Sequence, residues 1–233
     1  MTHPQPLKPL LGDTTGPLLQ RVGTSRLIAA LASVAALLLT FAILSSEMLE
    51  GETRTFDMAI LRTAQAWRAA HPWLAEVARD FSGVGSTAAL TLFVLLTVGY
   101  LLVCSARRSA VLVAVSTLSG TACMRGFKAL FGRARPDSSF AEFVVDGLSF
   151  PSGHSTMSAI VFITMGALVA RTQPRPAQGV FVLLGAASLV LLVGLSRVTL
   201  GVHYATDVIG GWAFGTAWAI VWSLLAIKWN EAG

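Results

Sequence analysis

Long apolar runs separated by short polar stretches dominate the chain. A helix needs about 20 residues, with a range of 17–25, to cross the hydrocarbon core of a bilayer. The shorter runs adjoin polar motifs into which their helices are expected to continue. The pattern therefore predicts an all-α, polytopic membrane protein with six transmembrane helices. The six runs are 27–45, 86–104, 109–125, 154–170, 179–195 and 208–227.

Residues 46–85 follow a different pattern, because apolar and charged residues mix at helical spacing. The segments 56–62 and 73–79 are the clearest cases. They predict short amphipathic helices that lie at the membrane interface between helices one and two. Trp67 and Trp73 suit such an interfacial zone. The alternative is an ordinary polar loop with some helix.

The composition supports a membrane protein. The chain has 233 residues, of which 54% are hydrophobic, and its mean hydropathy is +0.68. A soluble domain of this size would expose too much apolar surface. The length suits one domain, which we expect over 26–233 in the membrane. Residues 1–25 are polar and Pro-rich, and we expect them to form a cytoplasmic N-terminal tail. The catalytic core of that domain is expected at about 109–228.

Charge changes the picture in two ways. The net charge of +5 is modest, and its Lys and Arg residues are scattered between apolar runs, which argues against a nucleic-acid partner. Basic residues also favour cytoplasmic loops. They predict a multi-pass protein with both termini cytoplasmic, and the short compact chain without organelle signals suggests a bacterial inner membrane. The outer, periplasmic face then receives 46–85, 126–153 and 196–207.

Three polar clusters border these apolar runs. They are Lys128–Pro136, Pro151–His154 and Ser196–Asp207. The predicted topology brings all three to the outer face, although they are far apart in the sequence. Charges beside a bilayer are costly and commonly functional. The clusters therefore predict one shared site at that face.

Lys128, Arg135 and Arg197 supply three cations to this site. Guanidinium forks and ammonium groups both suit phosphate oxygens, so three together favour a phosphoryl ligand. The alternative for any single one is snorkelling to the interface. We assign Arg125 and Arg133 to that alternative, as residues outside the site.

Pro151, Ser152, Gly153 and His154 read as the start of a helix. Serine can cap a helix, and free backbone N–H groups at its N-terminus bind anions. Ser152 and Gly153 therefore become candidates for phosphate binding. The alternative is a plain capped helix, against which His154 is the main argument.

His203 and Asp207 are four residues apart, which places them on one face if both are helical. A carboxylate bonded to one imidazole nitrogen fixes the tautomer and leaves the other nitrogen for chemistry. A purely structural pair is the alternative. No further Cys, Asp or Glu completes a metal-ligand set at suitable spacing, so neither a metal nor another cofactor is expected.

The three clusters, in this order, resemble the signature of the type 2 phosphatidic acid phosphatase (PAP2) superfamily, which is K-x6-RP, PSGH and SR-x5-H-x3-D. Every defined position is matched. The resemblance implies a metal-independent phosphatase with a phosphohistidine intermediate. His203 would attack phosphorus with the help of Asp207, and His154 would act as general acid. The resemblance also implies that the phosphate is held by Lys128, Arg135, Ser152, Gly153 and Arg197.

The expected substrate is a membrane lipid phosphate or diphosphate, such as phosphatidylglycerophosphate, undecaprenyl diphosphate, phosphatidic acid or lipid A phosphate. One alternative is a vanadate-dependent haloperoxidase, which shares the signature but is soluble in known cases. The other is a non-catalytic lipid-phosphate binding or transport protein, which would need cations but no acid–base pair. The sequence predicts no oligomeric state.

A spacing of small residues in the last apolar run also has two interpretations. Gly211 and Gly215 form a small-xxx-small pattern, with Gly210 adjoining it. Such a pattern permits close helix approach in a membrane. Simple tolerance of glycine in membrane helices is the alternative.

Overall fold

The computed structural model describes residues 15–231, and that range contains helices but no strand. Six stretches are long and apolar enough to cross a membrane, which confirms the predicted number of spans. The second stretch, Trp73–Val103, joins two helices. In chain order the elements are α1 (Thr15–Glu50), α2 (Arg54–Ala70), α3 (Trp73–Val84), α4 (Thr87–Val103), α5 (Arg107–Phe131), η1 (Ser138–Phe140), α6 (Gly153–Arg171), α7 (Pro176–Thr199) and α8 (Ala205–Glu231).

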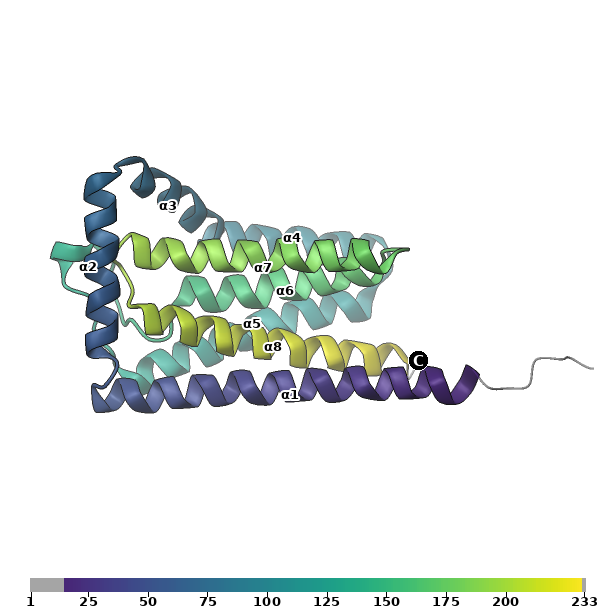
Figure 1. The fold of residues 1–233 in the computed structure, drawn as a ribbon. Helices are drawn as coiled ribbons and strands as arrows, with labels where there is room; N and C mark the ends of the chain where they lie inside the picture. Colours follow the sequence, from purple (N-terminus) through teal and green to yellow (C-terminus); the bar gives the residue numbers. More distant parts are fainter. Residues whose placement is uncertain (1–14, 232–233) are drawn as a thin grey trace, which may run out of the picture.

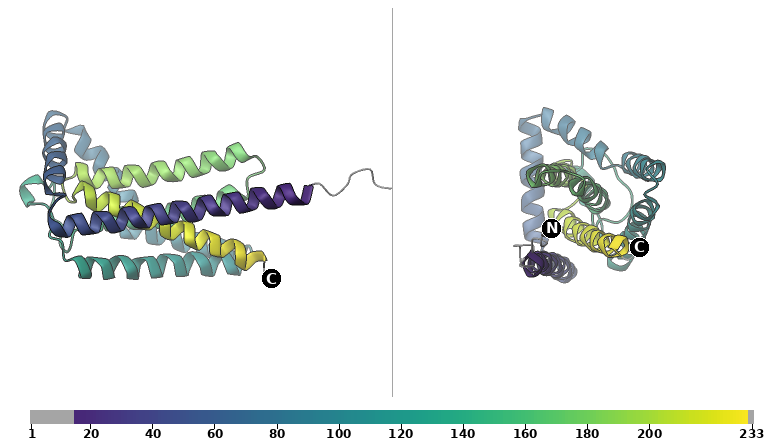
Figure 2. Two further views of the ribbon diagram at one scale, coloured as in Figure 1. Left: turned by 60° about the horizontal axis from the view of Figure 1, so that its bottom comes forward. Right: turned by 90° about the vertical axis from the view of Figure 1, so that its right-hand side faces the viewer.

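The long helices form a bundle with α6 packed between α7 and α8 (Figures 1 and 2). Helix α1 runs along α8, and α4 lies beside α5. Helix α2 lies across one end of the bundle, while α3 runs obliquely from α2 towards α4 (Figure 1). The two short helices predicted after the first span are therefore present, and each is longer than the pattern suggested, although α3 belongs to the second apolar stretch, Trp73–Val103.

The first helix begins earlier than the sequence pattern suggested. Residues 15–25, which we expected in a tail, belong to α1. Pro17 does not prevent this, because proline is tolerated in the first turn of a helix, where backbone N–H groups have no intrahelical partner. The remaining part of the expected tail, residues 1–14, lies outside the described residues.

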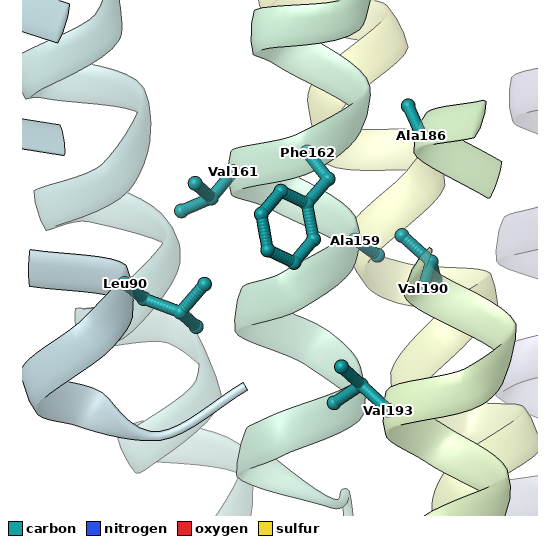
Figure 3. Close-up of a cluster of buried hydrophobic side chains, with 7 residues drawn as sticks. All are labelled: Leu90, Ala159, Val161, Phe162, Ala186, Val190 and Val193. Carbon is teal, nitrogen blue, oxygen red and sulfur yellow. The ribbon is translucent and has the colours of Figure 1, made fainter. Parts of the chain in front are cut away.

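One buried apolar cluster joins α4, α6 and α7, and its side chains interlock between the helices (Figure 3). Leucines such as Leu95 and Leu96 on α4 instead face outward and are exposed. An outward apolar face combined with small buried clusters is what a bilayer-embedded bundle requires. The residues of this cluster are Leu90, Ala159, Val161, Phe162, Ala186, Val190 and Val193.

Glycines set the distance between α6 and α8. A Cβ atom added to Gly211 would lie 2.9 Å from the carbonyl oxygen of Ser152, and one added to Gly215 would lie 2.5 Å from that of Thr156. Both neighbours are backbone atoms, which cannot move without displacing α6. The small-xxx-small pattern therefore serves close helix approach, and mere tolerance of glycine does not explain it.

Gly215→Ala is expected to lower the free energy of unfolding by about 1–3 kcal/mol, because the added methyl group overpacks the contact with Thr156. The matched control is Gly99→Ala in α4, where an added Cβ meets nothing within 4 Å. Thermal unfolding in detergent, followed by circular dichroism, measures both. Equal midpoints for the two variants would contradict this account of the α6–α8 contact.

Candidate active site

The three polar clusters lie together at the end of the bundle that α2 crosses (Figure 1). Helix α5 ends at Gly132, whose left-handed backbone (φ 61°) closes the last turn on the carbonyl of Lys128. The chain then continues as a long connection, 132–152, over this end of the bundle. Lys128 Nζ donates to the carbonyl oxygens of Leu148 (2.5 Å) and Ser149 (3.2 Å), which ties the connection to α5.

His203 and Asp207 form the predicted pair, but not on one helical face. Helix α8 begins at Ala205, so His203 lies in the turn before it. Gly201 (φ 72°) shapes that turn, and a Cβ atom there would collide with the carbonyl of Phe140. Helical spacing alone could not indicate this left-handed turn. His203 Nδ1 lies 3.2 Å from Asp207 Oδ2.

Asp207 Oδ2 collects further donors. Ser149 Oγ donates to it at 2.5 Å, and the backbone N–H of Tyr204 donates at 2.9 Å. Ser149 Oγ also lies 3.3 Å from His203 Nδ1. Sequence analysis missed Ser149, because nothing in the pattern of the 132–152 connection distinguishes one of its polar residues from another.

Arg135 lies on the other side of the imidazole. Its Nη1 is 3.0 Å from His203 Nε2 and donates to the carbonyl of Val202 at 2.8 Å. A guanidinium group can only donate, so Nε2 must accept, and the ring proton sits on Nδ1 facing Asp207 and Ser149. This tautomer leaves the lone pair of Nε2 on the side of the cations.

Burial lowers the pKa of His203 to about 4, although the hydrogen bond from its ring to Asp207 acts in the opposite direction. The nearby cations Arg135 and Lys128 lower it further. The imidazole is therefore neutral at neutral pH. Only the neutral ring has a free lone pair, so His203 is ready to act as a nucleophile.

The Pro151–His154 cluster starts α6 as the sequence predicted. Ser152 is the N-cap, its hydroxyl accepts from the N–H of Ser155 (3.4 Å), and its own N–H donates to the carbonyl of Asp207 (2.9 Å). A Cβ atom added to Gly153 would lie 4.0 Å from Lys128 Cε, which puts the helix start beside a cation. The free backbone N–H groups at the N-terminus of α6 and the ammonium group of Lys128 together can attract an anion.

His154 occupies the first turn of α6 and is half-buried. It lies close enough to interact electrostatically with Arg197, His203, Arg135 and Lys128. The second histidine of the signature therefore faces the same small volume as the first. Because an imidazole both donates and accepts protons, this position suits an acid–base group.

Arg197, in the last turn of α7, completes the set of cations. Its side chain is buried, its Nη1 donates to Ser82 Oγ on α3, and its guanidinium lies 5.9 Å from the ring centroid of Phe143. Its buried Nε has no hydrogen-bond partner in the structure. An unpaired buried donor is costly, and an oxyanion bound among these cations would satisfy it.

Arg133 lies at the site, contrary to its assignment from the sequence as a snorkelling residue outside it. Its guanidinium lies 2.6 Å from Asp207 Oδ1 and 2.6 Å from Asp57 Oδ2. It also lies over the ring of Tyr204, 4.2 Å from its centroid. The snorkelling interpretation was wrong because the sequence does not show that α2 folds back over this end. Arg125, assigned to the same alternative, is exposed on α5.

Asp57 and Thr206 were also missed. Asp57 is completely buried and accepts from Thr206 Oγ1 (2.7 Å) and Thr206 N (3.0 Å). The sequence did contain a signal for Asp57, because it falls one turn before Leu61 on the apolar side of α2. A charge on that side requires a buried partner.

Among the residues whose side chains the structure describes, 24–226, no three His, Cys, Asp or Glu side chains are grouped so that they could hold a metal ion together. Positive charge near His203 comes instead from Lys128, Arg135 and Arg197. A small cavity of about 60 Å³ adjoins Arg135. Apolar side chains of the 132–152 connection, including Phe143, Val144 and Val145, line its other walls.

The chain is similar in sequence to two known phosphatases, to one of them over most of its length. Phosphatidylglycerophosphatase B of Bacillus subtilis (strain 168) is 30% identical over 183 residues, which cover 77% of this chain and 87% of that protein. A lipid A 1-phosphatase of Rhizobium johnstonii is 37% identical over 100 residues, 39% of this chain and 36% of that protein.

The fold also matches a solved structure. The crystal structure of a transmembrane PAP2 type phosphatidylglycerolphosphate phosphatase from Bacillus subtilis superposes with a TM-score of 0.74 and 28% identity, covering 86% of this chain and 96% of the other. The sequence profile of the PAP2 superfamily matches residues 109–231, which is more than half of the chain. The chain therefore belongs to the PAP2 superfamily.

Proposed function

We propose that the protein is a membrane lipid phosphatase that hydrolyses a phosphate or diphosphate ester of a lipid through a phosphohistidine. One observation carries this proposal. The Nε2 lone pair of a neutral His203 points to the side where Arg135 lies, and Arg197, whose Nε has no partner, is within electrostatic reach of Arg135 and His154. This arrangement suits a nucleophile that faces a group of cations able to hold an oxyanion.

In the proposed first step, His203 Nε2 attacks phosphorus and the P–O bond to the lipid alkoxide breaks as the N–P bond forms. Lys128, Arg135 and Arg197, with free backbone N–H groups in the Ser152–Gly153 region at the start of α6, hold the equatorial oxygens, where negative charge is spread. Asp207 stabilises the charge that develops on the ring, which its 3.2 Å contact with Nδ1 supports. His154 gives its proton to the leaving oxygen.

In the second step, His154 accepts a proton from water, and the oxygen of that water attacks phosphorus. The N–P bond breaks, inorganic phosphate leaves and His203 regains its lone pair. The same imidazole thus donates in one step and accepts in the other, which returns the site to its starting state. No step requires a metal ion, because fixed cations supply the stabilising charge.

The substrate is proposed to be a lipid because the site lies at an end of an apolar bundle. The cavity beside Arg135 has a cation on one side and apolar side chains on the other, which suits the junction of a phosphate with a hydrophobic chain. The names of the relatives point to phosphatidylglycerophosphate and lipid A phosphate as first choices. We further propose that this end faces outward from a bacterial inner membrane, with both termini in the cytoplasm.

The two other functions considered from the sequence receive less support. The soluble haloperoxidases do not share the six spans. A non-catalytic binder would not need the complete His154, His203 and Asp207 set beside the cations. Neither alternative is favoured by the relatives, which are phosphatases.

The test is phosphate release by the full chain, purified in detergent, from phosphatidylglycerophosphate, phosphatidic acid, undecaprenyl diphosphate and lipid A. Turnover of at least one lipid is expected. Excess EDTA should leave the rate unchanged, because the positive charge at the site comes from Lys and Arg side chains. Loss of activity in EDTA that Mg²⁺ restores would contradict the metal-free mechanism. Binding without release from any lipid would contradict the phosphatase itself.

A further inference from the structure

A buried polar network connects α2 to the catalytic carboxylate. Arg133 Nη2 donates to Asp57 Oδ2, and Arg133 Nη1 donates to Asp207 Oδ1, both at 2.6 Å. Both carboxylates are fully buried, and the guanidinium between them is only 13% exposed. Short charge-assisted bonds in such surroundings are among the stronger polar contacts in proteins.

Asp57 also fixes the start of α8. Its two oxygens accept from the backbone N–H (3.0 Å) and the hydroxyl (2.7 Å) of Thr206, which lies in the first turn of that helix. Asp57 is therefore an N-terminal cap supplied by a distant part of the chain. Thr206 Oγ1 accepts in turn from Arg133 Nη1 at 2.8 Å. Asp57, Arg133 and Thr206 are therefore each hydrogen-bonded to the other two.

The two oxygens of Asp207 have separate surroundings. Oδ1 faces Arg133, whereas Oδ2 faces His203 Nδ1, Ser149 Oγ and the N–H of Tyr204. The contact with Arg133 thus sets the rotation of the carboxylate, and that rotation decides how Oδ2 meets the imidazole. Misplacement of about 1 Å near reacting groups can cost on the order of 100-fold in rate.

The charges point to a second effect of Asp57. One cation, Arg133, lies between two buried carboxylates, so its positive charge is shared. Without Asp57 the whole charge of Arg133 would act on Asp207 and weaken its attraction for a positively charged imidazole. With Asp57 present, Asp207 retains more of its negative charge for His203.

We propose that Asp57 is a positioning residue of the phosphatase reaction, which acts through Arg133 to orient Asp207 and preserve its charge towards His203. This inference rests on the proposed function. It makes α2, the helix lying across the end of the bundle, part of the catalytic apparatus through the contacts of Asp57 with Arg133 and Thr206.

The principal variant is Asp57→Asn, and its matched control is Asp80→Asn, the same change at an exposed site on α3. Asp57→Asn is expected to lower kcat about 10- to 100-fold with KM within about twofold of the parent, since the phosphate cage is intact. Asp80→Asn should match the parent. An increase in KM with unchanged kcat would overturn the proposal, as would parental values of both.

Titration of His203 is a second measurement that needs no turnover. NMR of histidine-labelled protein, with His203→Gln to assign the signal, reports its midpoint. Loss of the Asp57 charge is expected to move that midpoint to lower pH, while the other groups facing the ring stay in place. Those groups are Asp207, Arg135, Lys128 and His154. A midpoint shared by Asp57→Asn and Asp80→Asn would overturn the charge argument.

A double-mutant cycle on the reaction rate tests most strictly whether Asp57 acts through Asp207. If Asp57 acts through Asp207, then Asp57→Asn should reduce single-turnover rates by less than about twofold in an Asp207→Asn background. The full 10- to 100-fold loss in that background would show an independent role and overturn the proposal.

A second variant and the titration of His203 cover two cases: an Asp57→Asn protein that does not fold, and a parent that cleaves no lipid. If Asp57→Asn does not yield folded protein, Thr206→Val removes the hydroxyl of the network without changing charge, and a fall in kcat of about 3- to 10-fold is expected. An unchanged kcat there would overturn the proposal. If the parent cleaves no lipid, the proposed function fails, and the His203 titration still decides whether Asp57 acts on the ring.

Discussion

His203→Ala is expected to reduce kcat for the preferred lipid by about 10⁴-fold or more, because the change removes the nitrogen that is proposed to attack phosphorus. Folding should survive, since the change removes a ring from a polar site and leaves the α6–α8 contact untouched. The measurement is phosphate release in the steady state, together with trapping of the radiolabelled phosphoryl group on the protein after an alkaline quench, in which the N–P bond survives. Label should bind the parent and be absent from the variant.

The control for this variant is His71→Ala. His71 is exposed at the corner between α2 and α3, far along the chain from the three clusters. It should retain parental turnover and trapping. Full turnover by His203→Ala, or label that persists in it, would assign the nucleophile to another residue.

His154→Ala is expected to show a loss that depends on the leaving group. A lipid alkoxide must be protonated as it leaves, so kcat for a lipid should fall about 10²- to 10⁴-fold. The p-nitrophenolate ion is a stable leaving group that needs no proton. The first cleavage of p-nitrophenyl phosphate should therefore remain fast, while hydrolysis of the phosphohistidine, which uses the same imidazole as base, should be slow.

Stopped-flow absorbance separates these two steps. The expected trace for His154→Ala is a burst of about one p-nitrophenolate per active site, followed by slow turnover. His71→Ala again serves as the control and should resemble the parent. An equal loss of rate for both substrates without a burst would contradict the role of His154 as an acid for the leaving group.

The helices and the three signature clusters could be read from the sequence because both are local patterns. An apolar run reports its own length, and a motif such as Pro151–His154 lies within one turn of one helix. The predicted topology then brings the clusters to one end, and the structure shows Arg135 in contact with His203 and Ser152 in contact with Asp207. The local patterns predict the helices and motifs, and the alternation of sides from one span to the next predicts which loops share a face.

The support around the site could not be read in the same way. Arg133 resembles any cation at a helix end, and only the return of α2 over the bundle shows that it binds two carboxylates. The position of His203 before α8 depends on the backbone of Gly201, and the role of Ser149 depends on the course of the 132–152 connection. These features come from contacts between distant segments, which spacing along one helix does not encode.

The hydrogen bond between Arg135 and His203 Nε2 has a consequence for inhibition. In this structure Nε2 of His203 accepts from Arg135, so we expect an uncharged alkylating reagent to react slowly with this nitrogen. A ligand with a phosphate or similar anion should draw the guanidinium to its own oxygens and so expose the nitrogen. Selective covalent probes for this histidine should therefore pair an electrophile with an oxyanion.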